Sequence, residues 1–352
     1  MEQANVFASL PGALLPWYDI NKRDLPWRAD RDPYHIWVSE IMLQQTRVEA
    51  VKGYYARFLR VLPSVEDLAK ADDELLHKLW EGLGYYSRVR NLKKAAQIIM
   101  TEHHGTFPGE YGKILALPGI GEYTAGAICS IAFDMPTPAV DGNVLRVVSR
   151  LNDDATPIDK PEFKKAVQLS LSQIYPTEAG AFTQALMELG ATLCGPNRKP
   201  DCENCPCRTF CQGYIKGTAH TLPVKMPKRG RRIEELTVFI LRCADRYALE
   251  KRPNKGLLAN LWQFPNTTGH LEIQQVIAEV EEMGLKPCEI TRQVERCHVF
   301  THIEWHMRGV YVDVKEINES YHWFTAQQIA QQAALPTAFR QFWDIAEDTE
   351  AR

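Results

Sequence analysis

The stretch that decides the fold reads Leu117-Pro118-Gly119-Ile120-Gly121-Glu122-Tyr123-Thr124-Ala125-Gly126. Its Gly-x-Gly turn precedes a run of small residues, which predicts a helix start whose backbone N–H groups are bare for a phosphate. Downstream, Val140-Asp141-Gly142-Asn143-Val144 places a carboxylate on a tight turn at the expected N-terminus of another helix. Either segment alone fits a structural helical hairpin or a simple helix cap. The two in this order indicate a site for phosphate and for carboxylate chemistry.

A third segment carries four closely spaced cysteines, Cys194, Cys202, Cys205 and Cys211, with a single C-x-x-C among them. A zinc ribbon uses two separated C-x-x-C pairs, so zinc fits this spacing poorly. A tight loop of four thiolates suits a [4Fe–4S] cluster. Nine cysteines in the chain favour a metal site over a disulfide framework in a reducing compartment.

Composition describes an ordinary globular protein: 352 residues, 45% hydrophobic and 24% charged, with room for two cores. No apolar run reaches membrane-span length, and the N-terminus lacks a signal-peptide pattern, so we expect a cytoplasmic protein without a targeting segment. The net charge of −3 gives no global basic signature for nucleic acid. A DNA enzyme of this charge relies on local phosphate contacts.

The texture of the chain changes after about residue 220. Apolar residues recur at helical spacing before that point, in segments that include Val38–Leu59, Ala69–Trp80, Leu92–His103 and Pro161–Ile174. After it, short β-branched or aromatic runs predict strands, at Leu236–Arg242, Tyr247–Lys251, Val299–Ile303 and Val310–Val314, with a helix at Ile273–Met283. We therefore predict an all-α domain over 1–221, a Pro-rich basic linker over 222–234 and an α+β domain over 235–352.

In this order and spacing the motifs resemble the helix-hairpin-helix DNA glycosylases of the endonuclease III superfamily, which flip a base out of duplex DNA. The resemblance implies that Gly119 and Gly121 meet the DNA backbone and that Asp141 stabilises the developing sugar cation. Members that also cut the strand carry a lysine where this chain has Tyr123. A monofunctional glycosylase is implied, with Tyr123 and Asn143 supporting Asp141 and the sugar.

The segment Ser39-Glu40-Ile41-Met42-Leu43-Gln44-Gln45-Thr46 resembles the MutY-type, adenine-removing branch, whose glutamate is the general acid. That role needs a carboxylic acid whose pKa is raised by burial. We place Glu40 near a helix start, where the alternative is an exposed carboxylate favoured by the helix dipole. Further residues would contact the DNA or wedge the duplex: Gln44, Gln45, Thr46, Tyr85 and Arg88. Trp27, Arg28 and Glu188 would line the adenine pocket.

The resembled glycosylases carry a [4Fe–4S] loop after the catalytic region, which implies Cys194, Cys202, Cys205 and Cys211 as ligands. Two departures concern this loop. Seven residues lie between Cys194 and Cys202, where the family usually has six, and Cys207 is an extra thiol. The other cysteines, including Cys297, read as ordinary buried or surface residues.

The segment Gly256–Pro265 resembles the entry to a Nudix fold, but the metal-binding box that a Nudix hydrolase needs is missing. Aligning that box on Glu281-Glu282-Met283-Gly284 puts Ile277 and Ala278 where its Arg and Glu belong. In the adenine-removing branch this domain instead reads 8-oxoguanine on the opposite strand. The reading loop resembles Val299-Phe300-Thr301-His302, in which Phe300 stacks or wedges while Thr301 and His302 hydrogen-bond the damaged base. The alternative is a plain strand end.

The resemblance covers about residues 15 to 345 and implies a monomeric adenine DNA glycosylase acting on duplex DNA with an A:8-oxoguanine or A:G mispair. One alternative is a mismatch thymine or uracil glycosylase of the same superfamily. A non-enzymatic damage-binding protein would require loss of Glu40 or Asp141, and the sequence retains both.

Overall fold

The computed structural model describes residues 6–196, 199–227 and 230–350, with side chains described to residue 344. Two compact units form: Met1–Lys70 with Asn91–Pro227, and Ala71–Arg90 with Lys228–Arg352. Residues 71–90, which the sequence analysis assigned to the first domain, thus pack with the second unit. Of the predicted linker, residues 228–229 lie outside the described residues. No helix in the described ranges is long and apolar enough to cross a membrane.

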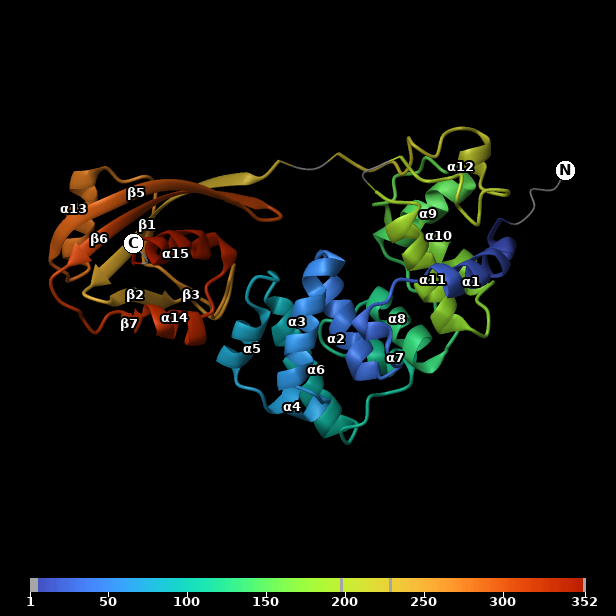
Figure 1. Cartoon of the computed structure of the whole chain (residues 1–352), viewed down its shortest axis with the longest axis horizontal. Helices are drawn as coiled ribbons and strands as arrows, with labels where there is room; N and C mark the ends of the chain where they lie inside the picture. The colour runs from blue at the N-terminus through green and yellow to red at the C-terminus, as the bar shows by residue number, and fades with distance from the viewer. Residues whose placement is uncertain (1–5, 197–198, 228–229, 351–352) are drawn as a thin grey trace. The chain divides into compact units, whose positions relative to one another are not determined.

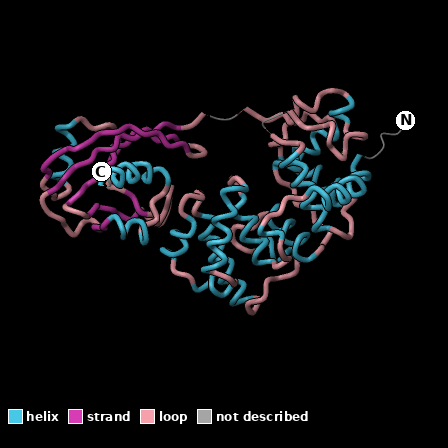
Figure 2. The backbone as a smooth tube through the Cα atoms, viewed as in Figure 1, coloured by secondary structure: helices cyan, strands magenta, loops and turns pink. Residues whose placement is uncertain are grey.

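The first unit is helical, as predicted, and Figure 2 shows its segments as cyan helices joined by loops. Its α-helices are labelled in Figure 1. The elements of this unit are η1 (Val6–Ser9), α1 (Leu10–Asn21), η2 (Pro26–Arg28), α2 (Pro33–Leu43), α3 (Val48–Val61), α4 (Val65–Lys70), α7 (Tyr111–Leu115), α8 (Glu122–Phe133), α9 (Gly142–Asn152), α10 (Pro161–Ser172), α11 (Ala179–Thr192) and α12 (Gln212–Ile215). α6 (Ser87–Glu102) begins in the second unit and continues in the first.

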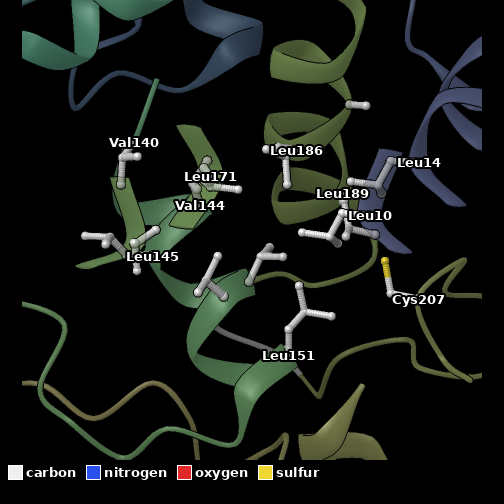
Figure 3. Packing of buried hydrophobic residues seen from close by; sticks show 14 of the residues in the cluster. Leu10, Leu14, Val140, Val144, Leu145, Leu151, Leu171, Leu186, Leu189 and Cys207 are labelled. Atoms are coloured by element: carbon white, nitrogen blue, oxygen red, sulfur yellow. The ribbon is translucent and has the colours of Figure 1, made fainter. Parts of the chain in front are cut away.

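The core beneath the candidate site forms where α1, α9, α10 and α11 bury their apolar faces together. Figure 3 shows Leu10 and Leu14 of α1 beside Leu186 and Leu189 of α11, and all four side chains are at most 1% exposed. Burying one leucine side chain stabilises the fold by about 1.5–3 kcal/mol. This packing fixes the two helices that carry Asp141 and Glu188.

The segment Val38–Leu59, which carries apolar residues at helical spacing, is helical but is broken into α2 and α3. The chain leaves the helix at Gln44, and Gln45 adopts a left-handed backbone with φ 57°. Apolar spacing continues on both sides of this break, so periodicity alone does not report it.

The second unit contains a mixed sheet of order β3-β2-β1-β6-β5, in which β4 pairs with β1 and β7 with β2. Only the β1–β6 pair is parallel among the described ladders. The strands are β1 (Arg232–Cys243), β2 (Arg246–Lys251), β3 (Trp262–Gln263), β4 (Asn266–Thr268), β5 (Pro287–Val299), β6 (Ile303–Val314) and β7 (His322–Thr325). This arrangement confirms the predicted α+β class.

Alternation along β1 explains why helices cover both faces of the sheet. Val238 and Ile240 pack with Phe339 and other residues of α15 (Thr337–Glu350). Phe239 and Leu241 face the other way, toward Val276 and Val280 of α13 (Ile273–Glu282), the helix predicted from the sequence.

The prediction of a strand at Val299–Ile303 is wrong. β5 ends at Val299 and β6 begins at Ile303, so residues 300–302 form the loop of an antiparallel hairpin. The Phe300 N–H donates to the Ile303 carbonyl at 2.8 Å and closes the turn. The sequence did not reveal the turn, because residues 300–302 include none of the glycine, asparagine or aspartate residues that usually mark a short hairpin loop.

The segment 71–90 is fixed to the second unit by polar contacts from α5 (Asp73–Trp80), which packs against α14 (Ala326–Gln332). The indole N–H of Trp262 donates to the Glu74 carboxylate at 3.1 Å. Glu81 accepts from the Leu335 N–H at 3.0 Å and pairs with Arg340 at 3.1 Å. Tyr85 therefore belongs to the same unit as the 300–302 loop.

Candidate active site

The predicted hairpin is present: α7, the Gly119-Ile120-Gly121 turn and α8 follow one another. Gly119 has φ +79°, and a Cβ there would lie 2.6 Å from the Cβ of Asn91, so only glycine fits. Gly121 is the N-cap of α8. The first N–H groups of a helix have no partner inside it, which makes this end suited to a phosphate oxygen.

A cavity of about 580 Å³ in the first unit brings the predicted catalytic residues together. α2 supplies Glu40, α8 supplies Tyr123, α9 begins beside Asp141, and α11 supplies Glu188. The cavity is lined by every catalytic residue proposed from the sequence and by the predicted contact residues of this region, namely Glu40, Tyr123, Asp141, Asn143, Trp27, Arg28, Gln44, Gln45, Thr46 and Glu188.

Glu40 does not lie near a helix start, as the sequence analysis expected, because α2 begins at Pro33 and ends at Leu43. The start is capped by Asp32, whose carboxylate accepts from the Tyr34 N–H at 2.8 Å. Glu40 is 5% exposed, which excludes the solvent-exposed alternative. Burial raises the pKa of Glu40 to about 7, against a hydrogen bond from the Tyr123 hydroxyl at 2.6 Å. A carboxyl group in this state can donate a proton near neutral pH.

Asp141 is held by donors on both of its oxygens. It caps α9, as predicted: Oδ1 accepts from the Val144 N–H at 2.8 Å and Oδ2 from the Asn143 amide at 2.6 Å. Arg146 in turn donates to the Asn143 amide oxygen at 2.8 Å, which fixes the orientation of that amide. Burial raises the pKa of Asp141, and these hydrogen bonds oppose the rise. The carboxylate is thus positioned as well as buried.

Glu188 anchors two arginines rather than offering a free carboxylate to the cavity. Its side chain is fully buried and accepts from Arg23 at 2.6 and 3.0 Å and from Arg28 at 2.7 Å. Burial alone would raise the pKa of Glu188, but the hydrogen bonds from Arg23 and Arg28 lower it. Trp27 is buried beside Tyr55 in an edge-on contact and forms another part of the wall.

The polar segment after α2 forms part of the cavity lining. Gln45 is exposed in its left-handed conformation, and Thr46 donates from its hydroxyl to the Gln44 carbonyl at 3.3 Å. The Gln44 amide reaches the Thr124 hydroxyl on α8 at 3.4 Å. A left-handed non-glycine residue is costly, and such residues cluster at functional sites.

Tyr85 and Arg88, also predicted to contact DNA, lie in the second unit and differ sharply in exposure. Tyr85 is 49% exposed and has φ 47°, a left-handed backbone like that of Gln45. Arg88 is buried, donates to the Leu83 and Gly84 carbonyls at 2.9 and 3.0 Å, and lies over the Trp80 ring. Its guanidinium therefore holds the turn that presents Tyr85, and the predicted contact of Arg88 with DNA stays a prediction.

A second cavity, of about 410 Å³, lies wholly within the second unit between the Tyr85 turn and the hairpin loop. Phe300, Thr301 and His302 line it, and the Tyr85 hydroxyl is 3.2 Å from the Thr301 hydroxyl. The Phe300 ring contacts His298 and Trp305 edge-on. The next two residues, Thr301 and His302, are exposed.

The four predicted metal ligands surround one small apolar cavity, together with Cys207, Leu151 and Leu189. Among the described residues, no three of these cysteines have sulfur atoms within 4.8 Å of one another. Cys207 is fully buried in the leucine core (Figure 3) and hydrogen-bonds with Cys205, which lowers the pKa of the Cys205 thiol.

The lining residues that sequence reasoning missed include Arg23, Gln184 and Met187. Gln184 lies four residues before Glu188 on α11, so helical spacing from Glu188 could have found it, and Met187 lies three residues after Gln184. Arg23 carries no comparable pattern, and only its pairing with Glu188 reveals it.

Comparison with known proteins gives two family matches. Residues 38–172 match the HhH-GPD superfamily of base excision DNA repair proteins, and residues 237–344 match the NUDIX domain. The chain is 37% identical to an adenine DNA glycosylase of Arabidopsis thaliana, over 86% of this chain and 56% of that protein. It is 33% identical to the adenine DNA glycosylase of Homo sapiens, over 95% of this chain and 73% of that protein. A solved thermostable thymine-DNA glycosylase aligns with 60% of the chain and 97% of its own, at 30% identity and a TM-score of 0.54.

Proposed function

Since this chain belongs to the adenine DNA glycosylase family and is a DNA glycosylase, we propose that it removes adenine mispaired with 8-oxoguanine or guanine in duplex DNA. The observation that carries the proposal is Glu40: a buried carboxyl group with a pKa of about 7, at the wall of a cavity that also contains Asp141. The chain spans 56% of the length of the Arabidopsis relative and 73% of the length of the human one. The activity that their names state is therefore a proposal for this chain.

Glu40 supplies the proton that adenine needs in order to leave. Protonation at N7 draws electrons from the N9–C1′ bond, which then breaks with the electron pair going to the base. The neighbouring Tyr123 hydroxyl, 2.6 Å from Oε2, orients the carboxyl group. The bidentate pair of Arg23 with Glu188 and the adjoining Arg28 set one wall of the pocket that receives the base.

Asp141 stabilises the sugar cation left at C1′, and a water molecule then attacks that carbon. The Val144 N–H and the Asn143 amide already occupy one acceptor position on each carboxylate oxygen, which fixes the plane of the carboxylate toward the cavity. A fixed negative charge costs no reorganisation when the cation forms.

Tyr123 replaces the lysine that a strand-cutting glycosylase uses to form a Schiff base, so we propose monofunctional chemistry. A phenol cannot form an imine with the C1′ aldehyde. The test is an end-labelled duplex with A opposite 8-oxoguanine, analysed with and without alkali and after borohydride trapping. Strand breaks that need alkali, with no trapped complex, support the proposal; alkali-independent breaks with a trapped complex contradict it.

The 300–302 loop is proposed to read 8-oxoguanine on the strand opposite the adenine. Thr301 and His302 offer a hydroxyl and an imidazole at an exposed loop, with the Tyr85 hydroxyl 3.2 Å from that of Thr301. We expect Thr301→Ala to reduce the rate ratio between A:8-oxoguanine and A:G duplexes by about tenfold, because the variant loses one hydrogen bond to the damaged base. Thr301→Ser retains the hydroxyl and is the matched control. An unchanged ratio in Thr301→Ala would remove the loop from the recognition of the lesion.

The cysteine loop is proposed to hold a [4Fe–4S] cluster through Cys194, Cys202, Cys205 and Cys211. The four thiols line one apolar cavity, as such a group requires, whereas burial of Cys207 in the leucine core makes it a packing residue. The cluster would stabilise the loop and its DNA-facing surface, without redox chemistry during base removal.

A further inference from the structure

Three side chains of different metal-ligand types meet on the β5–β6 hairpin, next to its 300–302 loop. Cys297 pairs with His306 across the antiparallel ladder, and Glu304 lies two residues before His306. Because side chains alternate along a strand, all three lie on the same side of the sheet. That side faces solvent, since Cys297 is exposed and the intervening Trp305 is buried on the other side.

The ligand atoms are already close to one another. Glu304 Oε1 lies 3.0 Å from His306 Nε2 and 3.5 Å from Cys297 Sγ, and the three atoms are within 4.8 Å of one another. Tetrahedral zinc, with bonds of about 2.0–2.3 Å, separates its ligand atoms by about 3.3–3.8 Å. The Cys297–Glu304 separation lies in this range, the Glu304–His306 separation is slightly shorter, and the Cys297–His306 separation is at most 4.8 Å.

We propose that Cys297, Glu304 and His306 form a binding site for Zn²⁺, with water as the fourth ligand. The thiol proton of Cys297 passes to solvent on binding, while His306 binds through the lone pair of neutral Nε2. The two ligand charges of the thiolate and the carboxylate balance the 2+ ion.

The electrostatic surroundings allow a cation here. Arg308 follows His306 on the same side of the sheet, but it pairs with Glu272 at 3.4 Å and with Glu295 at 3.6 Å. The Nε–H of Arg231 donates to the Phe300 carbonyl at 3.1 Å. The bound ion would join the two strands immediately before and after the 300–302 loop; any effect on reading the lesion rests on the proposed function, whereas zinc binding does not.

The test is thiol labelling of the full-length protein with a maleimide, with and without Zn²⁺, followed by peptide mass spectrometry. Cys288 is the internal control, because it is also exposed on β5 but belongs to no such group among the described residues. At a free Zn²⁺ concentration ten times the Kd, labelling of Cys297 should slow about tenfold while that of Cys288 is unchanged. Resolution by peptide separates this site from any zinc bound in the cysteine loop.

His306→Ala and Glu304→Gln should each weaken the protection of Cys297 at least severalfold, with the fold checked by circular dichroism. Equal protection of Cys288 and Cys297 by Zn²⁺, or full protection of Cys297 in His306→Ala, would overturn the proposal. Neither result depends on glycosylase activity, so failure of this site and failure of the proposed function are distinguishable.

Discussion

At the scale of single residues, the chemistry depends on one buried carboxyl group. With a pKa of about 7, Glu40 is protonated below that pH and charged above it. The single-turnover excision rate should therefore be level below pH 7 and fall about tenfold per pH unit well above it. Glu40→Gln should lower the rate by about 10²- to 10⁴-fold and abolish this limb, with binding of the mispaired duplex retained. A fully active Glu40→Gln enzyme would refute the general-acid role.

Tyr123 tunes the same group. Its hydroxyl donates to Glu40 and thereby opposes the rise in the pKa of that carboxyl group. In Tyr123→Phe the pKa of Glu40 should rise further, so the falling limb of the pH–rate profile moves to higher pH. Tyr111→Phe, on α7 and outside the cavity lining, is the control and should leave the limb in place. If the falling limb lies at the same pH in Tyr123→Phe and Tyr111→Phe, Tyr123 does not affect the pKa of Glu40.

The sequence anticipates residue roles only where a motif specifies them. The Asp141 cap and the gathering of Glu40, Tyr123 and Asn143 around one cavity agree with the motif order. The sequence does not anticipate that Arg88 is buried and that two backbone carbonyls hold its guanidinium. Cys297 read as ordinary, since its neighbours in space come from another strand.

At the scale of elements, the α7–α8 hairpin depends on the left-handed turn at Gly119. Gly119→Ala should lower the free energy of unfolding by about 1–3 kcal/mol, because alanine resists φ +79° and its Cβ would meet Asn91. It should also weaken DNA binding through the displaced turn. Gly112→Ala is the control: no atom lies within 4 Å of its Cβ, and alanine favours the α7 helix. Thermal unfolding and a DNA titration measure both; wild-type values for Gly119→Ala would contradict this reading.

Element type was more predictable than element ends. Periodicity identified the helices of the first unit, but the break after Gln44 and the turn at 300–302 escaped it. Both interruptions lie at candidate functional positions, where tertiary contacts override local preference. A helix that continued through Gln45 would hold the polar residues after α2 in helical backbone. The break instead gives Gln45 its left-handed conformation at the wall of the cavity.

At the scale of the whole molecule, the two-domain class followed from composition, but the attachment of residues 71–90 to the second unit did not. That attachment uses single contacts such as Trp262 to Glu74, which leave no periodic trace in the sequence. It places Tyr85 beside Thr301, so the second unit carries a wedge candidate and a reading candidate together.

The cysteine loop gives a prediction for the molecule's iron content. A [4Fe–4S] cluster gives about four iron atoms per chain. Cys202→Ser should reduce the iron content well below that value and should weaken binding to duplex DNA. Cys207→Ser tests the fifth thiol and should retain iron, as should Cys243→Ser on β1. Iron analysis and the visible absorption band measure the outcome. Full iron in Cys202→Ser, or its loss in Cys207→Ser, would change the ligand set.

The most direct test of the central claim is single-turnover base release from four duplexes, carrying A opposite 8-oxoguanine, A opposite G, T opposite G and U opposite G. The account predicts free adenine from the first two, faster from the first, and no thymine or uracil from the others. Release of thymine or uracil in place of adenine would move the chain to the mismatch-glycosylase alternative. No release from any duplex, with binding retained, would contradict the catalytic assignment of Glu40 and Asp141.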